Sequence, residues 1–133
     1  MNRPTATDLG RIPLLSGLSG HTRAVLAAIM ETDVAEAGHA VVTEGRSGYA
    51  FYVIDSGHAD VVHEGQQLRQ LGPGDFFGEI AIMGEGRRTA SVIATELLTT
   101  WVLFGASFRA LEKDQPEVAA ALQEAMRERL ATG

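Results

Sequence analysis

One stretch of the sequence, FFGEIAIMGEGRRTASVIA at residues 76–94, brings glycine, acidic and paired basic residues together in an order that suits anion binding. A turn that begins at Gly78 would point the backbone N–H groups of Glu79, Ile80 and Ala81 in one direction, at the start of a short helix. Because glycine has no Cβ, an anion can approach this backbone closely. The stretch therefore predicts a small anion-binding turn.

An anion held by backbone N–H groups also needs a counter-charge, and Arg87 and Arg88 stand close by in the same stretch. A guanidinium group can grip a phosphate with two parallel hydrogen bonds. Glu79 would repel a phosphate unless its carboxylate faces elsewhere, and accepting hydrogen bonds from a sugar hydroxyl would suit it. Together these residues predict a site for a phosphorylated ribose.

Two other chemistries are less well supported by the residues. Asp75 and Glu79 would form an acid/base pair, but the first also suits a turn and the second a sugar contact. His58 and His63 have an odd spacing, so on one strand they would face opposite sides. The metal-dependent cupins, which are also β-rolls, need a His-rich cluster with a Glu, a feature that this sequence lacks. We therefore expect no metal, no cofactor and no catalytic residue, and predict that the chain is not an enzyme.

The whole chain has the composition of a soluble, folded domain. It has 133 residues, of which 45% are hydrophobic and 21% charged, and its mean hydropathy is +0.03. Its 11 Lys and Arg against 17 Asp and Glu give a net charge of −6, which argues against a nucleic-acid partner. It has no Cys, which excludes disulfides and thiolate metal sites, and no apolar run near the roughly 20 residues that span a bilayer. We expect one cytoplasmic domain over residues 1–133, with no membrane insertion.

The residue pattern changes twice along the chain, from helical to β-type and back. Apolar residues at helical spacing predict one helix over residues 19–30, within an N-terminal helical part that covers residues 1–30. Residues 31–105 contain short β-type runs separated by glycine, which predict an antiparallel β-roll of the jelly-roll type. Helical spacing returns over residues 106–130, where Pro116 divides two predicted C-terminal helices. The fold class is therefore α+β and mainly β.

Two turn signals interrupt the β-type runs. Asp55 to Gly57 and the pair Glu64 and Gly65 each stand between two such runs. Glycine supplies the positive φ that tight hairpin turns need. Both signals therefore predict β-hairpins.

Taken in this order, the residues resemble a cyclic nucleotide-binding domain, the module of catabolite activator-type regulators, cyclic-AMP-dependent kinase regulatory subunits and cyclic-nucleotide-gated channels. The resemblance covers nearly the whole chain and includes the phrase LGPGDFFGE, followed, after eight intervening residues, by Arg, a small residue and Ala. Its glycine framework consists of Gly38, Gly45, Gly48 and Gly57. By this resemblance residues 76–94 form the phosphate-binding cassette, with a short helix of its own, and the wording RRTASV is most similar to the channel branch.

The resemblance implies a role for the polar residues of the cassette. Arg88 would pair with the cyclic phosphate, while Arg87, which stands where many members have proline, would lie at the surface. Glu79 would hold the ribose 2′-hydroxyl. The backbone amides from Gly78 to Ala81 would complete the phosphate site.

Further residues are implied around the base. Thr89 would contact the phosphate and, as in channel-type members, can reach the guanine amino group. Arg129, near the end of the last helix, would stack on the base or hydrogen-bond to it. The apolar positions that touch the base or support the pocket are Val61, Leu71 and Phe77. The alanine that ends the motif is Ala90.

The resemblance implies a regulatory sensor whose ligand is cyclic AMP or cyclic GMP, and we expect cyclic AMP. Ligand contact with Arg88 and with the turn at Gly78 would shift the helix over residues 106–113 and let the helix over residues 116–130 close over the base. The output partner would be a fused or separate effector protein, or a second copy bound through the C-terminal helix.

Three alternatives stay open at this point. The chain could be a regulatory fragment of a larger channel, transporter or enzyme. It could be an interaction protein that keeps the fold without a ligand, although the presence of both Glu79 and Arg88 argues against this. A transcription factor is disfavoured, because the chain is acidic and stops where a DNA-reading part would begin.

Overall fold

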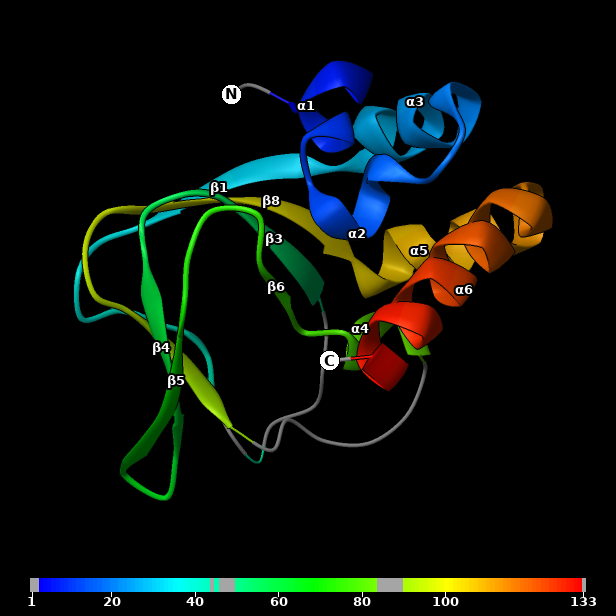
Figure 1. Cartoon of the computed structure of the whole chain (residues 1–133). Coiled ribbons are helices and arrows are strands. Elements are labelled where there is room, and N and C mark those ends of the chain that lie inside the picture. The colour runs from blue at the N-terminus through cyan, green and yellow to red at the C-terminus, as the bar shows by residue number, and fades with distance from the viewer. Residues whose placement is uncertain (1–2, 44, 46–49, 84–89, 133) are drawn as a thin grey trace.

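The computed structural model describes residues 3–43, 45, 50–83 and 90–132 of the chain. Its helices are α1 (Ala6–Gly10), α2 (Pro13–Ser16), α3 (Gly20–Ile29), α4 (Ile80–Met83), α5 (Gly105–Asp114) and α6 (Pro116–Thr132). Its strands are β1 (Glu31–Ala35), β2 (Ala40–Val42), β3 (Ala50–Ser56), β4 (Ala59–His63), β5 (Gln66–Leu71), β6 (Phe76–Phe77), β7 (Ser91–Ala94) and β8 (Leu98–Phe104). Figure 1 shows the strands curled together in one half of the molecule and most of the helices gathered beside them.

The strands form two four-stranded sheets. The first has the order β1-β8-β3-β6 and the second the order β2-β7-β4-β5. Every strand pairing in the described part of the chain is antiparallel. The predicted fold class, a mainly β antiparallel roll with helices at both ends, is confirmed.

Strand β3 shows how the layers are stacked. Successive side chains of a strand point to opposite faces of its sheet. Phe51 and Val53 pack into a core shared with the helices, whereas Ile54 packs into a second core between the two sheets. Because all three are at most 1% exposed, β3 is buried on both faces. The first sheet is therefore the middle layer, with the helices on one side and the second sheet on the other.

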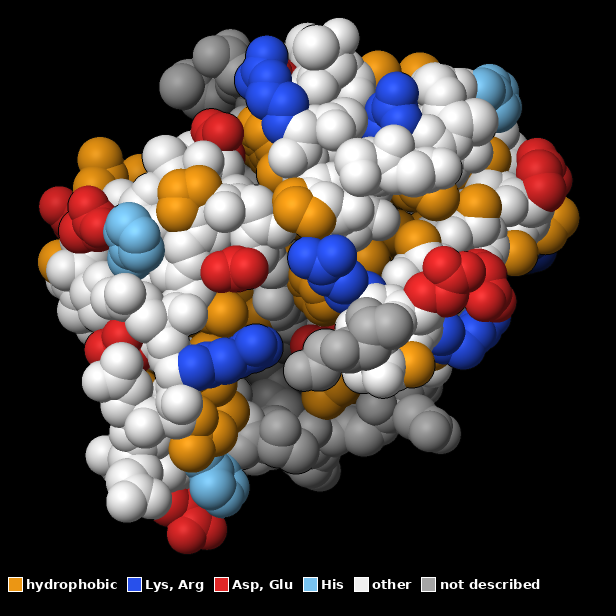
Figure 2. All heavy atoms as spheres, viewed as in Figure 1, with side chains coloured by type: hydrophobic (Ala, Val, Ile, Leu, Met, Phe, Trp, Pro, Cys, Tyr) orange, Lys and Arg blue, Asp and Glu red, His pale blue; other side chains and the backbone are white. Residues whose placement is uncertain are grey.

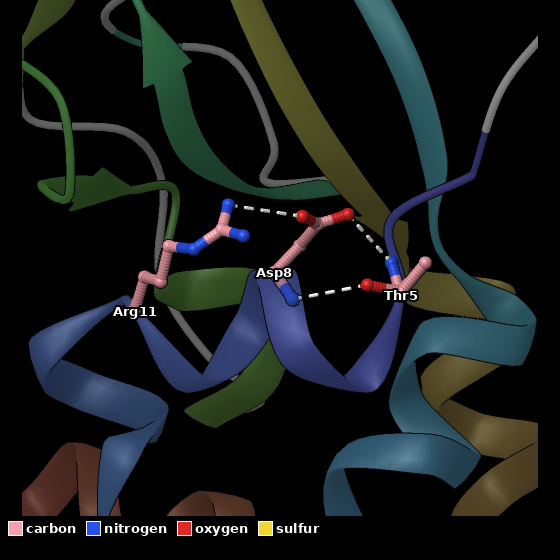
Figure 3. Close-up of polar contacts among 3 residues, drawn as sticks. All are labelled: Thr5, Asp8 and Arg11. Atoms are coloured by element: carbon pink, nitrogen blue, oxygen red, sulfur yellow. Dashed lines mark hydrogen bonds and ion pairs between the residues drawn. The ribbon is translucent and has the colours of Figure 1, made fainter.

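Two short helices, α1 and α2, precede the predicted N-terminal helix, which the structure shows as α3. Helix α1 begins with a capping box, in which Thr5 and Asp8 exchange hydrogen bonds between side chain and backbone (Figure 3). The N–H of Thr5 donates to the Asp8 carboxylate at 2.9 Å, and this bond is the main reason why the pKa of Asp8 lies below its ordinary value. Arg11 lowers the same pKa further through an ion pair of 3.1 Å.

One of the two predicted hairpins is correct and the other is wrong. Glu64 and Gly65, with φ of 50° and 79°, join the paired strands β4 and β5. The turn that ends at Gly57 instead connects β3 to β4, which belong to different sheets. Gly57 has φ of 91°, and a Cβ there would lie 2.3 Å from the carbonyl oxygen of Leu97, so this corner requires glycine.

Helices α5 and α6 match the two predicted C-terminal helices. Helix α6 begins with a proline and buries Val118, Leu122 and Met126, which recur every four residues, against the helical core. Leu130, the next residue of this series, is 46% exposed. Among the residues that the structure describes, no helix is long and apolar enough to cross a membrane.

Candidate functional site

A pocket of about 430 Å³, here called the inner pocket, lies between the second sheet and the segment that joins β6 to α4. Its apolar lining includes Leu71, Phe77 and Val92, which are at most 5% exposed and belong to the core between the sheets. The ring of Phe77 stacks on that of Tyr52, with centroids 4.8 Å apart and planes 9° apart. The apolar side of the pocket is therefore formed by side chains that also pack in the core between the two sheets.

The turn at Gly78 forms one wall of the inner pocket. Gly78 is buried and has φ of 81°, a backbone conformation that glycine adopts without strain. It leads directly into α4, whose first backbone bonds join the N–H of Ala81 to the carbonyl of Gly78 at 3.1 Å and the N–H of Ile82 to that of Glu79 at 2.9 Å. The N–H groups of Glu79 and Ile80 precede these bonds, at the end of a helix where N–H groups lack partners within the helix. The sequence predicts three such donors, from Glu79 to Ala81, but the N–H of Ala81 is already bonded to Gly78, which leaves those of Glu79 and Ile80 at the pocket-lining turn.

The side chain of Glu79 lies at the junction of two cavities. Glu79 is half-buried and lines both the inner pocket and a neighbouring pocket of about 440 Å³, here called the outer pocket. Asp75 also lines the outer pocket, but its carboxylate accepts the N–H of Gly72 at 2.8 Å and so stabilises the preceding turn. Glu79 is therefore the carboxylate that the two pockets share.

Two residues that sequence reasoning missed, Leu68 and Arg69, line the inner pocket from β5. Arg69 pairs with Val61 but the next pair joins Val62 to Gln67, so Leu68 is the extra residue of a β-bulge. The bulge allows these two consecutive side chains to reach the same pocket, although Leu68 is 59% exposed. A signal for Arg69 was present in the sequence, because it stands two positions before the buried Leu71 and so shares its face of the strand.

Arg69 also connects the inner pocket to the outer one. It lines both pockets, and the far side of the outer pocket is formed by Arg129 and Leu130 from the last turns of α6. Figure 2 shows basic side chains, in blue, on both the strand side and the helix side of the hollow on this face of the molecule. The end of α6 therefore lies over the opening that β5 borders.

Most of the residues that the sequence singles out come together here. Those that line the inner pocket are Val61, Leu71, Phe77, Gly78, Glu79, Ile80 and Ala90. Arg129 lines the outer pocket, and Ala81 packs into the helical core instead of facing either pocket. Arg88 and Thr89 lie outside the described residues. Within the described parts of the chain, no group of three or more His, Asp or Glu residues is placed to hold a metal ion.

A comparison with known families shows which family contains this pocket. The family model of the cyclic nucleotide-binding domain matches residues 32–115, from the first strand to the end of α5. The chain belongs to the cyclic nucleotide-binding domain family. The matched region includes both walls of the inner pocket and stops before α6.

Curated relatives of the domain include protein kinase regulatory subunits and a protein kinase. The chain is 42% identical over 104 residues to the cAMP-dependent protein kinase regulatory subunit of Eremothecium gossypii, covering 77% of the chain and 23% of that protein. It is 37% identical over 92 residues to the cGMP-dependent protein kinase egl-4 of Caenorhabditis elegans, covering 65% of the chain and 12% of that protein. The domain thus spans less than a quarter of the length of either relative.

Solved structures share its fold. The domain superposes with a TM-score of 0.80 on the N-terminal domain of a transcriptional regulator from Streptomyces coelicolor, at 28% identity, covering 94% of the chain and 93% of that structure. The regulatory domain of Toxoplasma gondii PKA, solved with cAMP, gives a TM-score of 0.75 at 26% identity, covering 92% of the chain and 48% of that structure. Membership of the cyclic nucleotide-binding domain family and the predicted β-roll are both confirmed, whereas the greater similarity to the channel branch stays a prediction, since the relatives named here are of the kinase type.

Proposed function

We propose that the domain binds a 3′,5′-cyclic nucleotide and acts as a regulatory sensor, without catalytic activity of its own. The observation that carries this proposal is the meeting of the Gly78 turn and Glu79 at one apolar pocket. A cyclic nucleotide needs all three features, since its phosphate is an anion, its ribose offers a 2′-hydroxyl and its base has flat faces that pack on apolar surface. Membership of the family supports the same ligand class.

Each part of the ligand has a proposed partner. The backbone N–H groups at the start of α4 and the guanidinium of Arg88 hold the cyclic phosphate, with Thr89 beside it. The carboxylate of Glu79 accepts a hydrogen bond from the ribose 2′-hydroxyl. Val61, Leu71 and Phe77 contact the base or support the surface on which it lies. Arg129 approaches the base from the side of the outer pocket.

Cyclic GMP is a second candidate ligand beside the expected cyclic AMP, because of Arg69. Its guanidinium only donates hydrogen bonds, and it shares the pocket face of β5 with Leu71. Guanine presents two acceptors, N7 and O6, on one edge, whereas adenine presents one acceptor and one donor there. Arg69 therefore favours guanine, while the cAMP-dependent regulatory subunits among the relatives support adenine. A cGMP-dependent kinase among the relatives agrees with guanine.

The output of the proposed sensor is a change in the position of α6. The end of this helix carries Arg129 and Leu130 to the outer pocket, so a bound base would favour the closed placement of the helix. The partner that responds is a fused or separate effector protein, or a second copy of the chain bound through α6.

Calorimetric titration of the nucleotide-depleted chain with cyclic AMP and cyclic GMP tests the proposal. We expect saturable binding of at least one nucleotide. Substitution Arg88→Ala should weaken it by about 10- to 150-fold, since a charge-assisted hydrogen bond contributes about 1.5–3 kcal/mol. Arg109→Ala, at an exposed position of α5, is the matched control and should bind like the wild type. Absence of binding to both nucleotides would leave an interaction module that keeps the fold as the better description.

A further inference from the structure

One side-chain amide, that of Gln123 on α6, contacts two other helices at once. Its Nε2 donates to the backbone carbonyl of Ile82 in α4 at 3.2 Å. The same nitrogen lies 3.4 Å from the carboxylate Oε2 of Glu112 in α5. The first bond is partly buried and the second is exposed, so the bond to α4 is the better shielded from water. Helix α6 is therefore tied directly to the short helix of the cassette.

The carbonyl that Gln123 binds has no partner of its own inside α4. This helix has only four residues, and the last four carbonyl groups of any helix receive no hydrogen bond from an N–H of the same helix. So short a helix is also unstable by itself in water and depends on its contacts. Ile82 supplies an apolar contact, since it is 1% exposed and packs with Phe108 and Leu122 in the helical core. Gln123 adds a directional contact to one defined carbonyl.

The bond from Gln123 and the proposed ligand contacts lie at opposite ends of one helical turn. The carbonyl of Glu79 accepts the N–H groups of Ile82 and Met83, both at 2.9 Å. A displacement of the Glu79 backbone therefore moves the peptide unit to which Gln123 is bonded. On the other side, Gln123 stands six and seven residues before Arg129 and Leu130, about 10 Å along α6 at 1.5 Å per residue.

We propose that Gln123 is the positioning residue that couples the cassette turn to the end of α6. It acts through the Ile82 carbonyl and needs no contact with the ligand itself. Apolar packing alone would tolerate small sliding movements of α6 over α4, whereas a hydrogen bond to a single carbonyl fixes one register. Nucleotide binding and the closed placement of the α6 end then favour each other, because both depend on the same equilibrium. This inference rests on the proposed function for its ligand-linked part.

Two substitutions of Gln123 test the coupling. Gln123→Met keeps the length and helix propensity of the side chain but removes the donor. Gln123→Glu keeps the shape and sets a carboxylate against the Ile82 carbonyl and against Glu112. The matched control is Glu112→Ala, which removes the exposed contact of the same amide and leaves the bond to α4 in place. Amide hydrogen exchange is followed in α4 and α6, with and without the nucleotide that binds best to the wild type.

In both Gln123 variants we expect faster exchange of the Ile82 and Met83 amides in the free chain. Nucleotide affinity should fall by about 2- to 12-fold, the range for one neutral hydrogen bond. Saturating nucleotide should protect α4 as in the wild type but protect the end of α6 less. Glu112→Ala should behave like the wild type in all three measurements. A residue with a purely structural role would lower stability without separating the protection of α4 from that of α6.

The proposal is overturned if both Gln123 variants keep wild-type exchange in α4, or if nucleotide protects the end of α6 as fully as before. A variant that fails to fold leaves the other variant to decide. Should the wild type bind neither cyclic nucleotide, the proposed function fails, and the contact between α6 and α4 is still judged from exchange in the free chain. Unchanged α4 exchange would then also reject the contact.

Discussion

The two walls of the inner pocket are held in place by very different amounts of structure. The strand wall consists mainly of residues from β4, β5 and β7, which are joined by antiparallel pairing that contains the β-bulge at Leu68. The opposite wall is the Gly78 turn and a helix of four residues, held by apolar packing and by the amide of Gln123. The difference suggests that the strand wall fixes the shape of the pocket, whereas the turn is the part able to shift when a ligand binds.

The largest expected effect concerns the strand wall. Leu71 is 2% exposed and belongs to the core between the sheets, so Leu71→Ala should lower the free energy of unfolding by about 2–5 kcal/mol. Leu68→Ala, on the same strand at a side chain that is 59% exposed, should change it by no more than about 0.5 kcal/mol. Urea denaturation of both variants measures the two values. Equal losses of unfolding free energy in the two variants would show that the burial of Leu71 does not stabilise the strand wall.

The turn should respond in the opposite way, with a loss of binding and little loss of stability. Glu79 is half-buried at the junction of the two pockets. Glu79→Gln removes the charge that the ribose hydroxyl would meet, and affinity should fall by about 10- to 150-fold, by the same reasoning as for a charge-assisted bond. Titration calorimetry and urea denaturation are both needed, with Glu36→Gln, at an exposed loop position, as the control. Unchanged affinity would remove Glu79 from the site.

Arg69 tests whether the strand wall also selects the base. If its guanidinium binds N7 and O6 of guanine, Arg69→Met should lower the ratio of cyclic GMP to cyclic AMP affinity by about 5- to 150-fold, because a bidentate contact contributes about 1–3 kcal/mol of discrimination. Arg109→Met, on the exposed face of α5, should leave the ratio unchanged. A ratio that stays the same in both variants would show that Arg69 does not read the base.

The sequence was informative where one local pattern decides the structure. Alternation and glycine spacing predict the roll, and the Gly78 turn with Glu79 could be located from residue types alone. The turn at Gly57 shows the limit of this reasoning, because a glycine turn looks the same whether it closes a hairpin or turns a corner between sheets. Which strands pair is decided by contacts far apart in the sequence.

The remaining omissions have the same physical origin. Helix α1 was signalled by Thr5 and Asp8 at capping-box spacing, but five residues are too few to show a helical period. The β-bulge that turns Leu68 toward the pocket depends on the register against β4. The bond between Gln123 and Ile82 joins residues 41 positions apart, so only the folded chain reveals it.

The smallest expected effect lies far from both walls, at the capping box of α1. The pKa of Asp8 is lowered, first by the N–H of Thr5 and further by Arg11, so the ionised carboxylate stabilises the fold. This stabilisation is complete above the unfolded pKa, close to the ordinary 3.8, and is lost as the pH falls through the lower folded pKa. The stability of the wild type should therefore exceed that of Asp8→Asn at pH 7, and the difference should shrink as the pH is lowered below 3.8. Nucleotide affinity should be equal in the two proteins. A change in affinity would show that the N-terminal helices also hold the movable wall of the pocket.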